Sequence, residues 1–125
     1  MQIGELSERA KVSHRTIHYY ERLGLVKPAE REGVGYRYYN ETALQRLDKI
    51  AALKRLGLSL DEIAAVIDLY FEDPSGIKGK EKVLEILQDQ LTKADTQLHE
   101  LTAGKRDLET NIARMHALIA KAKQA

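Results

Sequence analysis

The sequence predicts an all-α fold with a small β-wing, in which a helical head is followed by one long helix that pairs with a partner helix. Three observations predict it. Apolar residues in the first half recur at helical spacing between turn residues. A tyrosine-rich segment at 33–39, which begins Gly33-Val34-Gly35, is typical of a short hairpin. The chain from Lys80 onward has no proline and follows a heptad pattern.

Two short helices are predicted at the start of the chain. Residues 3–10 carry one apolar helical face, and Ser13 can cap a second helix over 14–23. Gly24 and Pro28 end that helix. Two short helices joined by a tight turn have the spacing of a helix-turn-helix, although short helix pairs occur in other folds as well.

Two more helices complete the predicted head. Asn40 is a suitable N-cap for a helix that runs to Leu56 and stops at Gly57. Ser59 and Glu62 have the spacing of a capping box, which opens the fourth helix. The sequence thus divides into a winged helical head at 1–71, a linker at 72–79 that is rich in turn residues, and a dimerisation helix at 80–125.

The last segment predicts a coiled coil. Twelve positions from 84 to 122 alternate in steps of three and four, and eleven of them are apolar where the 43% average composition predicts about five. This seam is about 58 Å long at 1.5 Å per residue, far more than the head can cover. A partner helix is therefore expected, and self-association supplies it. The predicted dimerisation residues are Leu84, Leu87, Leu91, Leu98, Leu101, Leu108, Ile112, Met115 and Ile119.

Composition excludes several classes of protein. The chain has no cysteine, so it has no disulfide, no thiolate metal site and no thiol switch. The longest apolar run, Ile63 to Ile67, is too short for a membrane span, and we expect a cytoplasmic, nucleoid-associated protein. Residues 1–57 carry 11 basic and 7 acidic side chains, a balance of +4, whereas residues 58–125 carry 9 and 12. Net positive charge is therefore concentrated in the first half of the chain.

Catalysis finds no support in the sequence. A glycine-rich phosphate loop, a His-Glu-x-x-His motif and a Gly-x-Ser-x-Gly motif are all absent. The four histidines, at 14, 18, 99 and 116, do not have the spacing of metal ligands. His99 and His116 fall at heptad positions that face solvent on the predicted coiled coil. We therefore expect no enzyme activity, no metal site and no cofactor.

Nucleic-acid binding is better supported. Cations and tyrosines interleave across the second helix, the predicted wing and the third helix, which is the pattern of an electrostatic footprint with hydroxyl donors. Arg15 lies near the N-terminal end of the second helix, the end that reaches base edges in a major groove. The alternative for the tyrosines is that Tyr20 and one or two wing tyrosines fill a small aromatic core.

Several ordered motifs resemble the DNA-binding head of the MerR family of bacterial transcription regulators. They are Ile3-Gly4-Glu5-Leu6, Thr16-Ile17-His18-Tyr19-Tyr20-Glu21, Gly24-Leu25-Val26, Pro28, Gly35-Tyr36-Arg37-Tyr38-Tyr39 and Leu56-Gly57-Leu58-Ser59-Leu60-Asp61-Glu62-Ile63. The resemblance implies a winged helix-turn-helix and an antiparallel coiled-coil homodimer. It also implies binding to double-stranded promoter DNA, with RNA polymerase affected indirectly through distortion of an overlong promoter spacer.

The resemblance also implies which residues contact DNA. They are Ser13, Arg15, Thr16, His18 and Tyr19 on the second helix, Arg31, Tyr36, Arg37 and Tyr39 in the wing, and Lys54 and Arg55 on phosphate. The family usually has Arg where this chain has His18, so that contact is expected to be weaker and sensitive to pH. The sequence has no cysteine, so we expect neither the metal-sensing nor the redox chemistry of the family, and we likewise expect no appended ligand domain of the drug-sensing branch.

Other functions stay open at this point. The same head fits a DNA-bending accessory protein of recombination or excision, and a coiled-coil adaptor that binds no DNA is a third alternative. A small-molecule effector is conceivable around Tyr70, Phe71 and Ile77, beside the linker, but packing of the linker explains these residues equally well. The sequence does not distinguish an activator from a repressor.

Overall fold

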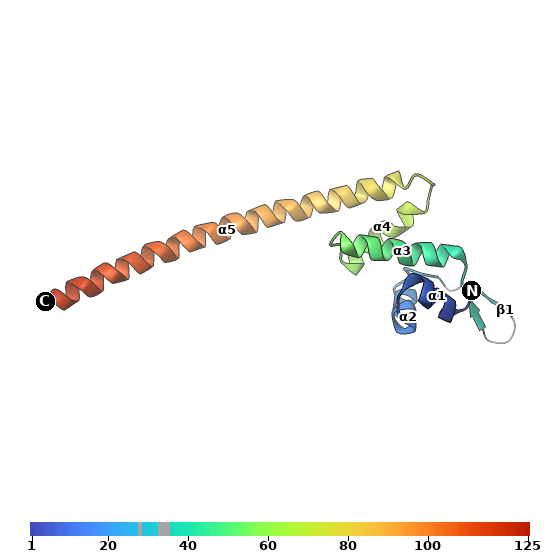
Figure 1. Cartoon of the computed structure of the whole chain (residues 1–125). Coiled ribbons are helices and arrows are strands. Elements are labelled where there is room, and N and C mark those ends of the chain that lie inside the picture. The colour runs from blue at the N-terminus through green and yellow to red at the C-terminus, as the bar shows by residue number, and fades with distance from the viewer. Residues whose placement is uncertain (28, 33–35) are drawn as a thin grey trace. The chain divides into compact units, whose positions relative to one another are not determined.

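The computed structural model describes the backbone of residues 1–27, 29–32 and 36–125, and the side chains of residues 1–27 and 38–125. These residues form helices and one pair of strands (Figure 1). The elements are α1 (Ile3–Ala10), α2 (His14–Arg22), β1 (Ala29–Glu32), β2 (Tyr36–Tyr38), α3 (Glu41–Arg55), α4 (Leu60–Tyr70) and α5 (Ile77–Gln124). The chain divides into two compact units, Met1–Val83 and Leu84–Ala125.

The first residues of α2, α3 and α4 are held by side-chain caps, as the sequence predicts. Ser13 Oγ accepts a hydrogen bond from the backbone N–H of Thr16 at 3.1 Å. Asn40 caps α3 in the same way. Ser59 and Glu62 form the reciprocal capping box of α4, with N···O distances of 2.9 and 3.2 Å. Each cap satisfies backbone donors that the first helical turn leaves unpaired.

The core of the first unit lies between its helices. α1 packs on α2 and α3, and α3 packs on α4. Each helix turns its apolar face inward, because residues three and four apart lie on one side of a helix. The fully buried side chains include Leu6, Ile17, Leu25, Val26, Ile50, Leu53, Ile63, Val66 and Ile67.

The strands β1 and β2 pair antiparallel in one two-stranded sheet. Arg31 lies opposite Arg37 and Glu32 opposite Tyr36, with an irregularity in the register between Ala29 and Arg31. The glycines at 33 and 35, predicted to make the hairpin turn, and Pro28 lie outside the described residues.

The segment predicted as a linker at 72–79 is largely ordered by local hydrogen bonds. The Asp73 carboxylate accepts bonds from the backbone N–H groups of Ser75 and Gly76 and from the Ser75 hydroxyl. Gly76 adopts a positive φ of 64°, which closes the turn. The last helix therefore begins at Ile77, whereas the sequence predicted residue 80, because this turn pre-arranges its first residues.

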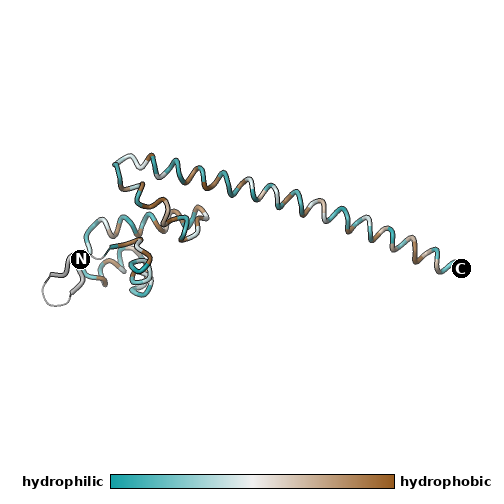
Figure 2. Tube along the Cα trace, turned by 180° about the vertical axis from the view of Figure 1, so that it is seen from behind, coloured by the Kyte–Doolittle hydropathy of each residue, from teal (hydrophilic) through white to brown (hydrophobic). Residues whose placement is uncertain are grey.

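The second unit consists of α5 from Leu84 onward. The helix continues through Gly104 and Lys105, the one defect in the heptad pattern. Apolar and polar residues alternate along it with helical spacing (Figure 2). No helix in the described part of the chain is long and apolar enough to cross a membrane.

Candidate nucleic-acid interface

The second helix of the helix pair, α2, presents a polar face outward because its apolar residues are used in the core. Ile17 and Tyr20 are buried. Arg15 lies two residues before Ile17 and Tyr19 two residues after it, and both side chains are exposed. The N-terminal end of α2 also carries a partial positive charge from its unpaired N–H groups. An exposed, basic helix start of this kind suits contact with an anionic ligand.

Four side chains of α2 line one surface pocket of about 320 Å³, namely Arg15, Thr16, Tyr19 and Arg22. The Arg22 guanidinium lies 5.8 Å from the centre of the Tyr19 ring, within cation–π range. Two cations, a hydroxyl and a phenol therefore converge at one place. These side chains can all donate hydrogen bonds, and phosphate oxygens and the acceptor atoms of base edges accept such bonds.

Arg22 is absent from the residues predicted to contact DNA. Its signal lies in the spacing, because Arg15, Tyr19 and Arg22 follow each other at i, i+4 and i+7 and so share one helix face. Arg22 does belong to the pattern of cations and tyrosines in the sequence, but the resemblance to the MerR family did not assign it a DNA contact.

Tyr39 corrects the sequence-based prediction. It was expected to contact DNA, but it is fully buried, and its hydroxyl donates a hydrogen bond to Glu21 of α2. The Glu21 side chain is itself only 8% exposed, and it lies 3.6 Å from Nδ1 of His18. A buried tyrosine cannot reach a duplex, so Tyr39 supports α2 from within the head.

The remaining predicted residues are spread over other elements. His18 is half-exposed on α2, and Ser13 is exposed, with its side chain used as the N-cap. Lys54 and Arg55 are exposed in the last turn of α3. The side chains of Arg31, Tyr36 and Arg37 lie outside the described residues.

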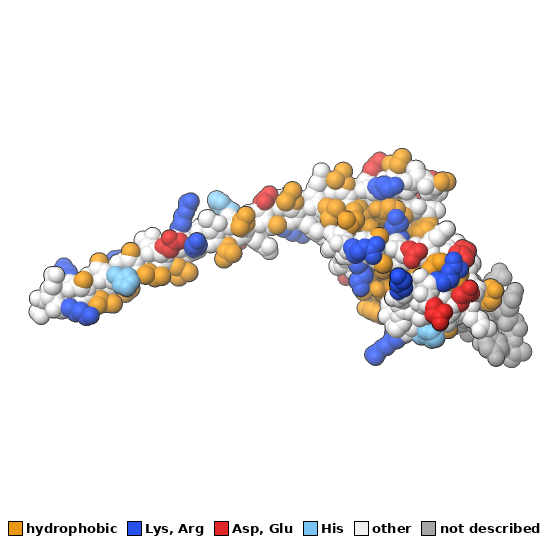
Figure 3. Space-filling model, in the orientation of Figure 1, with side chains coloured by type: hydrophobic (Ala, Val, Ile, Leu, Met, Phe, Trp, Pro, Cys, Tyr) orange, Lys and Arg blue, Asp and Glu red, His pale blue; other side chains and the backbone are white. Residues whose placement is uncertain are grey.

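The face of the head that is turned to the viewer in Figure 3 carries both acidic and basic side chains. Positive charge therefore does not cover the whole of the face that this view shows. In the part of the chain that the structure describes, no group of three or more His, Asp or Glu residues is placed to hold a metal ion.

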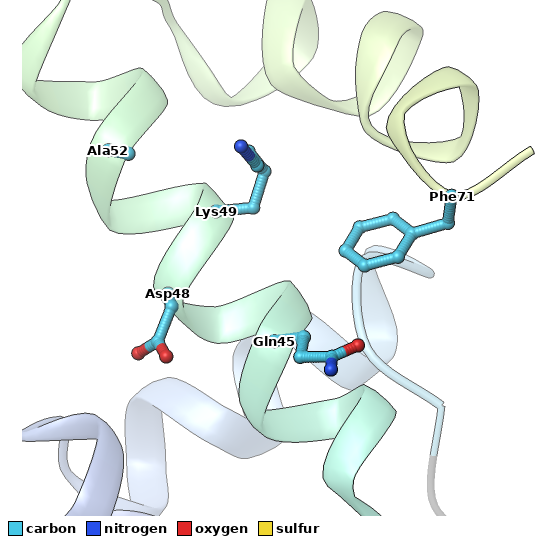
Figure 4. A pocket seen from close by; sticks show the side chains of 5 residues that line it. All are labelled: Gln45, Asp48, Lys49, Ala52 and Phe71. Atoms are coloured by element: carbon cyan, nitrogen blue, oxygen red, sulfur yellow. The ribbon is translucent and has the colours of Figure 1, made fainter. Parts of the chain in front are cut away.

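A second pocket, of about 320 Å³, lies on α3 (Figure 4). Gln45, Asp48, Lys49 and Ala52 line it together with Phe71, which follows α4. Of the three residues around which an effector was considered, Phe71 lines this pocket, Tyr70 packs on neighbouring elements and Ile77 is exposed.

Comparison with known families agrees with this geometry. A family model described as "MerR HTH family regulatory protein" matches residues 1–69, and one described as "MerR, DNA binding" matches residues 44–111. The chain belongs to the MerR family. Members of this family are transcription regulators with a DNA-binding domain, and such proteins are generally not enzymes.

Relatives within the MerR family differ in length. The transcriptional regulator HmrR of Rhizobium leguminosarum bv. viciae is 39% identical over 116 residues, which cover 93% of this chain and 87% of HmrR. The nodulation protein NolA of Bradyrhizobium elkanii is 34% identical over 112 residues, and the match spans 47% of NolA. The activator TipA of Streptomyces coelicolor is 40% identical over 72 residues, only 28% of its length.

Solved structures of MerR regulators resemble the chain as well. PbrR691 of Ralstonia metallidurans CH34, solved in complex with lead(II), superposes with a TM-score of 0.67 at 31% identity, over 86% of this chain and 81% of that one. HiNmlR, described as a MerR regulator that lacks the sensor domain, was solved bound to promoter DNA. It superposes with a TM-score of 0.55 at 25% identity, over 87% of this chain and 78% of that one.

Proposed function

We propose that this MerR-family regulator acts as a homodimer that binds an inverted repeat in a promoter and controls transcription by distorting the promoter spacer. One observation carries the proposal. Eight of the nine predicted dimerisation residues are exposed in the single chain, with fractions from 51% to 73%. Each such side chain forfeits about 1.5 to 3 kcal/mol if it stays in water. Orange apolar side chains recur along this helix in Figure 3.

A second copy of the same helix is the partner that fits the seam, and the antiparallel arrangement suits it better. The heptad places Lys105 at an a position. In a parallel pair every a residue faces the a residue of its partner, so two lysine ammonium groups would meet inside the seam. In an antiparallel pair an a residue faces a d residue. A register centred on the 84–122 seam sets Lys105 against the partner's Leu101.

A homodimer doubles the DNA-binding face. Two copies of α2 related by a two-fold axis match an inverted repeat, because operator symmetry mirrors protein symmetry. The exposed residues Arg15, Tyr19 and Arg22 are the side chains proposed to reach the major groove. Lys54 and Arg55 are proposed to hold phosphate, and the β1–β2 hairpin is proposed to act as the wing. RNA polymerase is affected indirectly, through the shape of the promoter. Bending or untwisting DNA costs free energy, and the contacts of the bound protein supply it.

The test has three readouts on the purified full chain. Sedimentation equilibrium gives the mass in solution, footprinting on DNA that flanks its gene locates the site, and in vitro transcription compares promoters with long and normal spacers. We expect a dimer, a protected inverted repeat whose binding weakens with salt, and regulation that disappears when the spacer is shortened.

Each readout can contradict the proposal separately. A monomer at micromolar concentration overturns the homodimer. Protection without any effect of spacer length on transcription overturns the distortion mechanism and favours a DNA-bending accessory role. Absence of salt-dependent protection overturns promoter binding itself.

A further inference from the structure

The ring of Tyr70, the last residue of α4, packs directly against the backbone at the start of α5. A Cβ atom added to Gly79 would lie 2.5, 2.7 and 2.8 Å from three carbons of this ring. A Cβ on Gly76 would lie 3.2 Å from a fourth ring carbon. Real Cβ atoms do not come within 3.0 Å of such carbons, so a side chain at Gly79 would displace the ring.

The same ring also contacts α3. The Lys49 ammonium lies 4.3 Å from the centre of the Tyr70 ring. One turn earlier, the Arg46 guanidinium lies 5.4 Å from the centre of the Phe71 ring. Lys49 and Phe71 line the same pocket (Figure 4). Burial raises the pKa of the Tyr70 phenol above its ordinary value of 10.0. Tyr70 therefore joins α3 to α5.

A glycine at position 79 is intrinsically unfavourable, because glycine inside a helix costs about 0.5 to 1 kcal/mol relative to alanine. Gly79 is buried and lies within the first turns of α5. Close approach of the Tyr70 ring gives a physical reason for a glycine there. Gly4, also helical, has nothing within 4 Å of an added Cβ and so has no comparable constraint.

We propose that Tyr70 is a positioning residue, which fixes the start of α5 on the DNA-binding unit and thereby sets the half-site spacing that the dimer accepts. The inference rests on the proposed homodimer. α3, which Tyr70 contacts through Lys49, ends in Lys54 and Arg55, the residues proposed to hold phosphate. The contacts of this one ring therefore link the helix proposed to touch DNA with the helix proposed to dimerise.

A small change in the direction of α5 at Gly79 becomes a large displacement farther along the helix. The centre of the seam at position 103 lies 24 residues beyond Gly79, or about 36 Å at 1.5 Å per residue. A tilt of about 10° at Gly79 displaces that point by about 6 Å. This is nearly two base-pair steps of about 3.4 Å, so the preferred spacing of the two half-sites is a direct measure of the junction.

The experiment uses the full chain and the operator found by footprinting. In a series of DNA fragments, the distance between its two half-sites is changed one base pair at a time. One further fragment keeps a single half-site. For Gly79→Ala we expect about tenfold weaker binding at the spacing that the wild type prefers, a change of about 1.4 kcal/mol. The optimum should move or broaden, while affinity for the single half-site stays within about twofold. Gly4→Ala, the matched control, keeps the wild-type profile.

Two further variants keep the test decisive if Gly79→Ala does not fold. Tyr70→Ala removes the ring and should broaden the spacing profile, whereas Tyr70→Phe keeps the ring and should restore it. An unchanged profile in Tyr70→Ala overturns the inference. So does an equal loss at every spacing and on the single half-site, because that describes a merely structural role. A wild-type protein that recognises no spaced repeat overturns the proposed function, and this inference with it.

Discussion

At the scale of single residues, two tyrosines of the head have different environments. Tyr39 is fully buried and donates to Glu21, whereas Tyr19 is 43% exposed and lines the pocket with Arg15. Side-chain chemistry is the same in both. The difference arises because Tyr19 faces away from the core on α2, and Tyr39 follows β2 into the interior. One tyrosine therefore supports the helix and the other belongs to its contact surface.

Tyr39→Phe should destabilise the head without changing sequence preference. A hydrogen bond to a charged group contributes about 1.5 to 3 kcal/mol, and this one is lost in the variant. Urea denaturation measures the change. Tyr38→Phe, an exposed position on β2, is the control and should change stability by less than about 0.5 kcal/mol. Equal stability of Tyr39→Phe and the wild type would contradict the supporting role.

Arg15 and Arg55 should differ in what they contribute to DNA binding. Arg15→Ala is expected to cost about 1 to 3 kcal/mol on the operator and to relax sequence choice, because a base contact is lost. Arg55→Ala should weaken operator and random DNA similarly and flatten the salt dependence. Fluorescence anisotropy on both DNAs over a salt series measures this. An equal loss for Arg15→Ala on operator and random DNA would rule out its role in base reading.

At the scale of elements, the turn before α5 shows how local hydrogen bonds replace a linker. The Ser75 hydroxyl and the backbone N–H groups of Ser75 and Gly76 all donate to the Asp73 carboxylate. The Lys80 ammonium donates to the Ser75 carbonyl oxygen at 2.9 Å, and Lys78 pairs with Glu72 at 3.2 Å. These contacts hold the residues that place Gly79 beside Tyr70.

The Asp73 carboxylate gives this turn a pH dependence of known sign. The hydrogen bond from the Ser75 hydroxyl, foremost, and those from the backbone lower the pKa of Asp73 below its ordinary value of 3.8. A carboxyl whose pKa is lower in the folded state stabilises it above the unfolded pKa, and this stabilisation is lost as pH falls through the folded pKa. Ser75→Ala should therefore raise the pKa of Asp73 toward 3.8.

A carbon-detected NMR titration of the Asp73 carboxyl measures this shift. Thr96→Ala, which removes a hydroxyl that bonds only within α5, is the comparison and should leave the pKa of Asp73 unchanged. If Ser75→Ala also leaves it unchanged, the hydroxyl is not the main cause of the lowered pKa.

At the scale of the whole molecule, the apolar seam on α5 stays exposed to water in a single chain. Leu98 is 64% exposed, so a charge placed there removes no packing from the monomer. Any loss must act through a partner. Leu98→Asp should weaken dimerisation by at least about 100-fold, because two leucines, one per copy, each lose about 1.5 kcal/mol or more.

Analytical ultracentrifugation measures the dimer dissociation constant of Leu98→Asp. The control is Thr96→Asp, which places the same charge two residues away at an outward heptad position and should remain dimeric. Binding to the full inverted repeat should fall with dimerisation, while affinity for one half-site persists. A Leu98→Asp protein that remains a dimer would place the interface elsewhere.

The sequence by itself determined the features that depend on neighbouring residues. The caps at Ser13, Asn40 and Ser59 were predictable because a side-chain oxygen and a backbone N–H three residues on are always close together. The heptad on α5 was predictable because a seam repeats locally. The MerR motifs were recognisable for a similar reason, since each is a short run of residues in fixed order.

Only the tertiary structure decided which side chains are buried and which are brought together. Tyr39 meets Glu21 across 18 residues, and Lys49 meets Tyr70 across 21. The start of α5 at Ile77 and the need for glycine at 79 depend on the ring of Tyr70 and on the Asp73 turn together. Such contacts depend on how helices pack, and packing is set by many weak interactions between distant residues that no local pattern contains.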